Sequence, residues 1–218
     1  MWIRNISAGF RSSAKPINIL DLLIMKHLII YSHINDESFS HAILETVVAE
    51  SKNKNAEFEV RDLTALNFNP LLSAADMESL NRGETPADIR AEQKFVEWAD
   101  VISFIYPLWW GHMPAILKGY IDRVFAYDFA YSCKENGEPI GLLPGKKIMM
   151  FTPMGNPTEL YEKMGMIKAL ELTTDTCIFE YCGITDIKHL HFGNISLVDD
   201  AARKEMLQQS AQLVSKTL

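Results

Sequence analysis

Two adjacent tryptophans follow an apolar segment and are the residues of this chain best suited to bind a planar ligand. They lie in the run Tyr106-Pro-Leu-Trp-Trp-Gly-His-Met-Pro. Pro107 removes a backbone donor and ends a strand, whereas Pro114 suits the first turn of a helix. Open α/β sheets bind ligands at this junction, outside the carboxyl ends of their strands. We therefore expect Trp109 and Trp110 to form a flat wall for a ring-shaped ligand.

A second segment has the composition of an anion site. Residues 32–41 read Ser-His-Ile-Asn-Asp-Glu-Ser-Phe-Ser-His and precede an apolar helix pattern. Ser38 and Ser40 can cap that helix, and its free N–H groups and dipole can bind a phosphate. The segment lacks the glycine-rich dinucleotide fingerprint and the Walker lysine, so ATP and a Rossmann-type nicotinamide site are disfavoured. Simple helix capping is the alternative interpretation.

A third polar turn follows the apolar residues Ile148 to Phe151. It contains Thr152, Gly155 and Asn156, which supply a hydroxyl, a closely approachable backbone and an amide. Such short groups can bond the polar edge of a planar ring. An ordinary strand-to-helix turn is the alternative.

The run from Tyr106 to Tyr131 resembles the flavodoxin-like NAD(P)H:quinone oxidoreductase family. This family includes the DT-diaphorases, bacterial drug-activity modulators and ancillary reductases of potassium-efflux systems. The matching pattern, Pro-Leu-x-Trp-x-x-x-Pro-Ala-Ile-Leu-Lys-Gly-x-x-Asp-Arg-Val-Phe, is long and specific. A weaker likeness extends from Met25 to about Gly193.

The resemblance implies a non-covalent flavin, FMN or FAD, with NADH or NADPH as the electron donor. It implies flavin contacts from His33, Ser38, Phe39, Ser40, Pro107, Leu108, Trp109, Trp110, Thr152, Gly155 and Asn156. It also implies a homodimer in which Phe129 and Tyr131 cover the site as a substrate or partner wall.

The chain departs from the family pattern in two places. Relatives commonly carry Thr-Thr-Gly-Gly where this chain has Pro153 and Met154. Tyr161 matches a tyrosine that the family places near the flavin, and we predict a catalytic role for it. The histidine that accompanies this tyrosine in the family is missing, because no histidine occurs between His112 and His189. Lys163 and Lys168 are the candidates to replace it.

Strands and helices alternate along the chain from Met25 onward. We predict a doubly wound, five-stranded parallel sheet of order 2-1-3-4-5, with helices on both faces, which is the flavodoxin-like α/β fold. The predicted strands are 27–31, 57–62, 101–106, 146–152 and 187–192, and the predicted helices 38–51, 86–98, 114–125, 158–180 and 199–216. Residues 67–85 read as a long connection, and Asn136-Gly137 indicates a hairpin or flap within residues 129–144.

Composition excludes several classes of protein. The 218 residues are 48% hydrophobic and 22% charged, as in an ordinary globular domain. A net charge of −7 without a Lys/Arg-rich run argues against nucleic acid and anionic lipid as partners. No direct membrane insertion is expected. Three cysteines without a Cys-x-x-Cys spacing support neither a disulfide framework nor a zinc site, and favour a reducing cytoplasm.

Residues 1–24 differ from the flavodoxin-like domain predicted for residues 25–218. They carry Arg4, Arg11 and Lys15 against Asp21, and lack the features of a secretory signal. Because Met25 begins a complete first strand, we interpret them as an N-terminal extension of uncertain role, with a transit peptide as the alternative.

Two further pairs of residues resemble functional motifs. His189 and His191 share one face of a predicted strand, but no nearby Cys or carboxylate completes a metal set, so we assign them to packing or to the surface. Asp122 and Arg123 are adjacent on a helix and cannot face each other, which favours a structural ion pair or cap.

The resemblance implies an oxidoreductase that transfers two electrons, as hydride, from NAD(P)H to quinones, and also to nitro or azo compounds. Successive use of one flavin face by both substrates implies ping-pong kinetics. Two alternatives stay open. One is a redox-sensing ancillary subunit of a membrane transporter, and the other is a flavodoxin-like electron carrier.

Overall fold

Five parallel strands form the central layer of the computed structural model, which describes residues 24–218. Their order is β2-β1-β3-β6-β7, so the predicted sheet order is confirmed. The strands are β1 (Lys26–Tyr31), β2 (Glu57–Asp62), β3 (Val101–Ile105), β6 (Lys147–Pro153) and β7 (Asp186–Phe192). Each begins and ends within one residue of its prediction, because each is a nearly continuous apolar or alternating run between turn residues.

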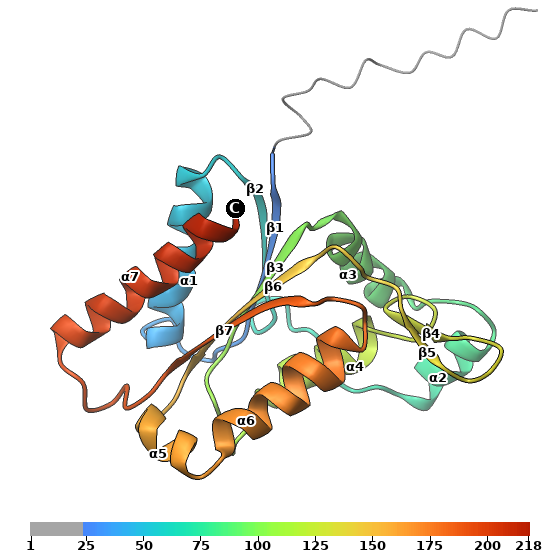
Figure 1. The fold of residues 1–218 in the computed structure, drawn as a ribbon. Helices are drawn as coiled ribbons and strands as arrows, with labels where there is room; N and C mark the ends of the chain where they lie inside the picture. The colour runs from blue at the N-terminus through green and yellow to red at the C-terminus, as the bar shows by residue number, and fades with distance from the viewer. Residues whose placement is uncertain (1–23) are drawn as a thin grey trace, which may run out of the picture.

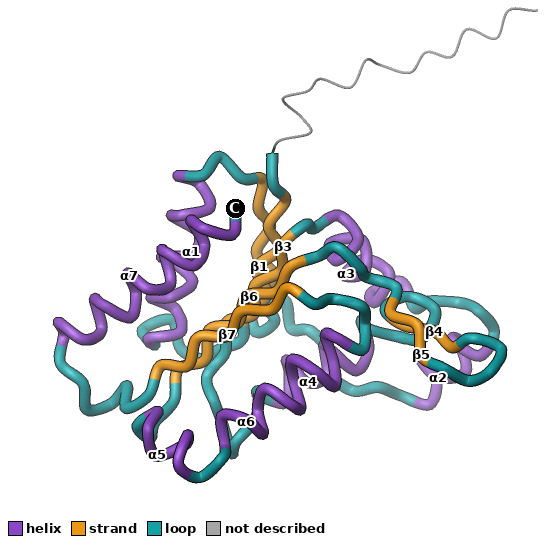
Figure 2. The backbone as a smooth tube through the Cα atoms, viewed as in Figure 1, coloured by secondary structure: helices purple, strands orange, loops and turns teal. Residues whose placement is uncertain are grey.

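Helices cover both faces of this sheet (Figures 1 and 2). They are α1 (Phe39–Asn53), α2 (Ala74–Asn81), α3 (Ala87–Trp98), α4 (Ala115–Val124), α5 (Thr158–Lys163), α6 (Met166–Glu171), the π-helix η1 (Leu172–Glu180) and α7 (Asp200–Thr217). Helices α1 and α7 pack together on one face, and α3, α4 and η1 pack on the other. This arrangement is the predicted flavodoxin-like α/β fold.

The middle strand β3 is apolar except for Ser103, whose hydroxyl lies 2.7 Å from Nε2 of His27. Ile102 and Phe104 lie in the core under α3 and α4, whereas Val101 and Ile105 lie in the core under α1 and α7. All five residues of the strand are buried. A strand with helices on both sides is apolar along nearly its whole length rather than at alternate positions.

Two segments differ from the sequence prediction. The helix predicted over residues 158–180 is interrupted at Gly165, which adopts a left-handed conformation with φ of 75° and separates α5 from α6. After Glu171 the helix continues as the π-helix η1. The connection predicted over residues 67–85 contains α2, which begins with a capping box between Ser73 and Asp76. The predicted hairpin is confirmed by the antiparallel strands β4 (Tyr131–Cys133) and β5 (Pro139–Gly141).

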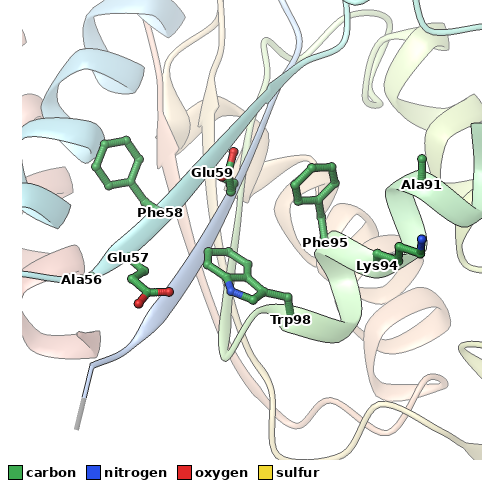
Figure 3. Close-up of a pocket in the computed structure, with 8 residues that line it drawn as sticks. All are labelled: Ala56, Glu57, Phe58, Glu59, Ala91, Lys94, Phe95 and Trp98. Atoms are coloured by element: carbon green, nitrogen blue, oxygen red, sulfur yellow. The ribbon is translucent and has the colours of Figure 1, made fainter. Parts of the chain in front are cut away.

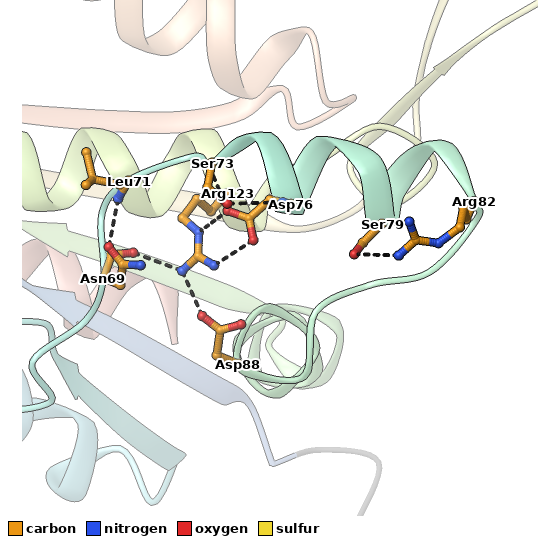
Figure 4. Close-up of polar contacts among 8 residues, drawn as sticks. All are labelled: Asn69, Leu71, Ser73, Asp76, Ser79, Arg82, Asp88 and Arg123. Atoms are coloured by element: carbon orange, nitrogen blue, oxygen red, sulfur yellow. Dashed lines mark hydrogen bonds and ion pairs between the residues drawn. The ribbon is translucent and has the colours of Figure 1, made fainter.

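Arg123 fixes the α2 segment to α4 through a buried polar cluster (Figure 4). Its side chain is 4% exposed and donates to both carboxylate oxygens of Asp76 at 3.1 Å, to Asp88 at 2.7 Å and to the carbonyl of Asn69 at 2.9 Å. Asp122 pairs instead with Lys118 one turn earlier. The interpretation of Asp122 and Arg123 as structural residues is thus confirmed, although they do not pair with each other.

The predicted N-terminal extension lies outside the described residues, except for Ile24. Among residues 24–218, no helix combines the length and the apolar character that crossing a membrane requires.

Candidate functional site

A cavity of about 370 Å³ opens at the carboxyl edge of the sheet, where four strand-to-helix loops meet. Cavities of this size accept small molecules and cofactors. Its lining comes from the loops after β1, β3, β6 and β7, and consists of His33, Ser38, Phe39, Ser40, Pro107, Leu108, Trp109, Pro153, Met154, Gly155, Ile195 and Ser196. Segments far apart in sequence thus converge at the position where parallel sheets bind ligands.

The loop after β1 contributes a helix N-terminus. Ser38 is the N-cap of α1, and its hydroxyl accepts a hydrogen bond from the amide of His41 at 3.2 Å. The amides of Phe39 and Ser40 have no carbonyl one turn before them, so they can donate to a ligand. No acidic residue lies in the first turn of α1. The cavity wall therefore combines free N–H groups with the positive end of a 15-residue helix, which favours an anion.

The loop after β3 is a tight aromatic turn. Trp109 and His112 exchange two backbone hydrogen bonds of 2.9 and 3.0 Å, and the residues between them, Trp110 and Gly111, have φ values of 50° and 75°. These are the dihedrals of a type I′ turn, which is costly for a bulky residue such as tryptophan. At Gly111 the positive φ favours glycine, and a Cβ there would in addition displace the terminal methyl of Met166, which would lie 2.3 Å away.

This turn separates its two tryptophans. Trp109 lines the cavity, and its ring centroid lies 5.8 Å from that of His33. The Trp110 side chain is fully exposed and is not part of the lining. Strained backbone at a bulky residue is typical of functional sites, so Trp110 stays a candidate to contact a bound ligand or a partner chain.

The loop after β6 leaves open space at Gly155. A Cβ placed on Gly155 would meet no protein atom within 4 Å, although the residue lines the cavity. The loop is tied to its neighbour because the amide of Leu108 donates to the carbonyl of Pro153 at 2.9 Å. At its far end, the Asn156 amide donates to the phenol oxygen of Tyr161 at 3.1 Å. The two residues that we singled out in this segment therefore lie in contact.

Thr152 has a different position from the rest of its loop. Its side chain is fully buried and its hydroxyl lies 2.8 Å from Nε2 of His189, behind the cavity. Phe129 and Tyr131 also lie apart, because they line two other cavities of the same chain. Tyr131 packs against Tyr127 and Tyr181 at centroid distances of 5.7 and 5.2 Å.

Ile195 and Ser196 were absent from our sequence interpretation. They follow β7 and reach the cavity because Met154 and Ile195 are joined across the two loops: the amide of Ile195 donates to the carbonyl of Met154 at 3.2 Å. Their position after a strand could have identified them, because all strands of a parallel sheet end at the same edge.

A second, larger groove of about 770 Å³ lies at the opposite edge of the sheet (Figure 3). It runs between the start of β2 and α3, and Phe95 and Trp98 form much of its wall. It faces the amino ends of the strands and includes no helix N-terminus, so it lacks the features that bind a phosphate-bearing ligand. We assign the candidate site to the first cavity.

The first cavity fits a flavin on the basis of its own residues. The α1 N-terminus suits the phosphate, the open space at Gly155 admits a ring close to the backbone, and Pro107 and Trp109 supply an apolar surface. Among residues 24–218, no group of three or more His, Cys, Asp or Glu side chains is arranged to hold a metal ion.

Comparison with known proteins identifies the relationship. The sequence model of a family described by its flavodoxin-like fold matches residues 25–216. An uncharacterized NAD(P)H oxidoreductase of Haemophilus influenzae is 42% identical over 189 residues, covering 86% of this chain and 93% of that protein. The chain belongs to the flavodoxin-like NAD(P)H:quinone oxidoreductase family. By homology it is an oxidoreductase of that type, as its sequence pattern indicated.

Solved structures agree with this assignment. An NAD(P)H:quinone oxidoreductase from Methanothermobacter marburgensis superposes with a TM-score of 0.81 at 26% identity, covering 89% of this chain and all of that one. An FMN-dependent NADH-azoreductase from Bacillus anthracis, solved in complex with FMN, shares the fold with a TM-score of 0.71 at 18% identity, over 89% of this chain and 99% of its own.

Proposed function

We propose that this protein is a flavoprotein that uses NADH or NADPH to reduce quinones by two electrons, and also reduces azo or nitro compounds. The observation that carries the proposal is the convergence, in one cavity, of the α1 N-terminus, the Trp109 turn and the open backbone at Gly155. These are the features that a phosphate-bearing tricyclic ring needs. The relatives described as an NAD(P)H oxidoreductase and an NAD(P)H:quinone oxidoreductase support the choice of electron donor and of acceptor class.

A bound flavin, FMN or FAD, supplies the hydride chemistry, accepting from nicotinamide and delivering to the acceptor. The protein binds the phosphate at Ser38, Phe39 and Ser40 and offers backbone at Gly155 to the ring edge. The phenol oxygen of Tyr161 already accepts from Asn156, so its own O–H is free to donate. We assign Tyr161 the role of holding a proton toward the ring during hydride transfer.

The kinetic consequence follows from the single ring face that both substrates must use. The nicotinamide and the acceptor both need the exposed side of one ring in a cavity of about 370 Å³. They must therefore bind in turn, and the oxidised nucleotide leaves before the acceptor enters. Ping-pong kinetics is the expected pattern.

We further propose that the site is completed by a second copy of the chain. Phe129 and Tyr131 lie away from the cavity of their own chain, whereas Trp110 and Tyr127 expose their rings. Exposed aromatic side chains of this density favour burial at an interface. Light scattering of the purified, flavin-bound protein is expected to give twice the mass of one chain. A flavin-bound monomer at micromolar concentration would rule out the shared site.

Reduction of bound flavin tests the proposed function directly. Purified protein mixed with FMN, or with FAD in a parallel sample, is expected to bind one flavin per chain and to quench its fluorescence. Under anaerobic conditions NADH or NADPH should bleach the yellow absorbance, and a quinone should restore it. An electron carrier would keep its colour with nicotinamide alone. If neither flavin binds, the proposed function is wrong.

A further inference from the structure

A chain of buried polar side chains lies directly behind the candidate site. The Thr152 hydroxyl is 2.8 Å from Nε2 of His189, and Nδ1 of His189 is 3.3 Å from Oδ1 of Asp175. The side chains of Thr152 and His189 are 0% and 3% exposed. The three residues come from β6, β7 and the π-helix η1. Because π-helical turns are rare and occur often at functional sites, the position of Asp175 on one needs an explanation.

The partners fix the direction of the hydrogen bonds. An ionised carboxylate only accepts, so Nδ1 of His189 carries the proton that faces Asp175. In the neutral ring with this tautomer, Nε2 has a free lone pair to which the Thr152 hydroxyl can donate. The Thr174 hydroxyl, which lies 2.7 Å from the same Asp175 oxygen, helps to hold the carboxylate in place. The chain thus runs from Thr152 through His189 to Asp175.

Tyr106 lies beside this chain, immediately after the neighbouring strand β3. Its phenol is buried and donates to Sδ of Met150 at 4.0 Å, and burial raises its pKa to about 12, so the phenol stays protonated. Tyr106 and Thr152 immediately precede the lining residues of two of the four cavity loops, and the amide of Tyr106 donates to the carbonyl of Phe151 at 3.2 Å. Movement of either residue would move a cavity wall.

His191 packs over the same imidazole. Its ring centroid lies 3.9 Å from that of His189, and its two ring nitrogens have no hydrogen-bond partner among the described residues. Burial, and secondly the neighbouring His189, lower the pKa of His191 to about 4, so it packs as a neutral ring. This contact holds the plane of His189 without competing for its hydrogen bonds.

The same residue types form nucleophilic triads in hydrolases. Such a role does not fit here, because the Thr152 hydroxyl is fully buried and cannot reach a substrate. The contact between His189 and Asp175, fourteen residues earlier in the chain, was not foreseen from the sequence.

We propose that Asp175 and His189 are positioning residues that fix Thr152, and through it the two cavity loops after β3 and β6, in the geometry that binds the ligand. The proposal rests on the proposed function in naming the ligand as a flavin. It assigns no proton transfer to these residues. Their contribution is to hold two loops ready before the ligand arrives.

Flavin affinity of three variants tests the proposal. In His189→Leu the Thr152 hydroxyl loses its acceptor and Asp175 its donor, and we expect the Kd for FMN to rise roughly tenfold or more. His189→Gln keeps one acceptor and one donor, and its Kd should stay within about threefold of the unmodified protein. Lys188→Gln, an exposed change one residue earlier on β7, is the control and should leave the Kd unchanged.

Each result has a definite meaning. An unchanged Kd in His189→Leu, or equal weakening in the leucine and glutamine variants, overturns the positioning role. Absence of FMN binding by the unmodified protein overturns the proposed function instead. The ¹⁵N NMR signals of His189 in the protein without flavin show which ring nitrogen carries the proton. They therefore test the hydrogen bonds from Thr152 to Asp175 independently of flavin binding. The Nδ1–H tautomer is expected, and an Nε2–H tautomer would show that the chain is wrong.

Discussion

Replacing Gly155 by leucine is expected to weaken FMN binding by roughly 100-fold or more, equivalent to about 2.7 kcal/mol, because the new side chain fills the cavity. A Cβ at this position meets no protein atom within 4 Å, and φ is not in the left-handed region, so the fold accepts a side chain there. The thermal midpoint of the protein without flavin should therefore change little. Fluorescence titration with FMN and thermal unfolding of the same samples measure the two effects.

The graded variant Gly155→Ala is the control for this prediction. One methyl group fills much less of the cavity than an isobutyl group, so the loss of affinity should be clearly smaller. Gly155 suits the test because the other described glycines either have a positive φ or would place a Cβ against a neighbour. FMN binding of normal affinity in Gly155→Leu would show that this loop does not face the ligand.

Replacing Arg123 by leucine is expected to lower the free energy of unfolding by about 3 kcal/mol, since removal of one partner leaves a buried charge uncompensated. Asp76 would lose both of its bonds to the guanidinium, and the Asn69 carbonyl would lose its donor. The α2 segment would then have lost its main polar attachment to α4 (Figure 4). Urea unfolding followed by circular dichroism measures the change.

The effect of Arg123 depends on pH in a predictable direction. Hydrogen bonding to Arg123 is the main cause that lowers the pKa of Asp76 below its ordinary value of 3.8. A lowered pKa in the folded state stabilises the protein above the ordinary value and loses this contribution as the pH falls. The difference between the unmodified protein and Arg123→Leu should therefore shrink below about pH 4.

Arg82→Gln is the matched control. Arg82 also pairs with a carboxylate, that of Glu84, but both side chains are more than half exposed. Exposed pairs contribute about 0–1 kcal/mol. A loss in Arg123→Leu no larger than in Arg82→Gln would contradict the structural role of the cluster.

The sheet could be predicted from the sequence because its strands are apolar where helices cover both faces, as in Val101 to Ile105. The helix α2 was missed because its apolar face is weak, although the Ser73 and Asp76 capping box was legible. The π-helix could not be predicted. Gly165 indicates a break, but a π-helical register arises from packing against the sheet rather than from a local pattern.

The candidate site was predictable to the extent that its residues follow strands. His33, Trp109 and Gly155 do so, and they line one cavity. The buried pair of Asp175 and His189 was not predictable, because it joins a strand to a π-helical turn whose geometry the sequence does not reveal. Long-range pairs of this kind require the tertiary structure.

The outermost strand β2 bears on how two copies can associate. Its exposed residues Glu57 and Glu59 place negative charges along an unpaired sheet border. Acidic side chains at such a border discourage another polypeptide from extending the sheet. Docking two β2 borders against each other would bring like charges into apposition, which opposes the formation of a continuous ten-stranded sheet through this border.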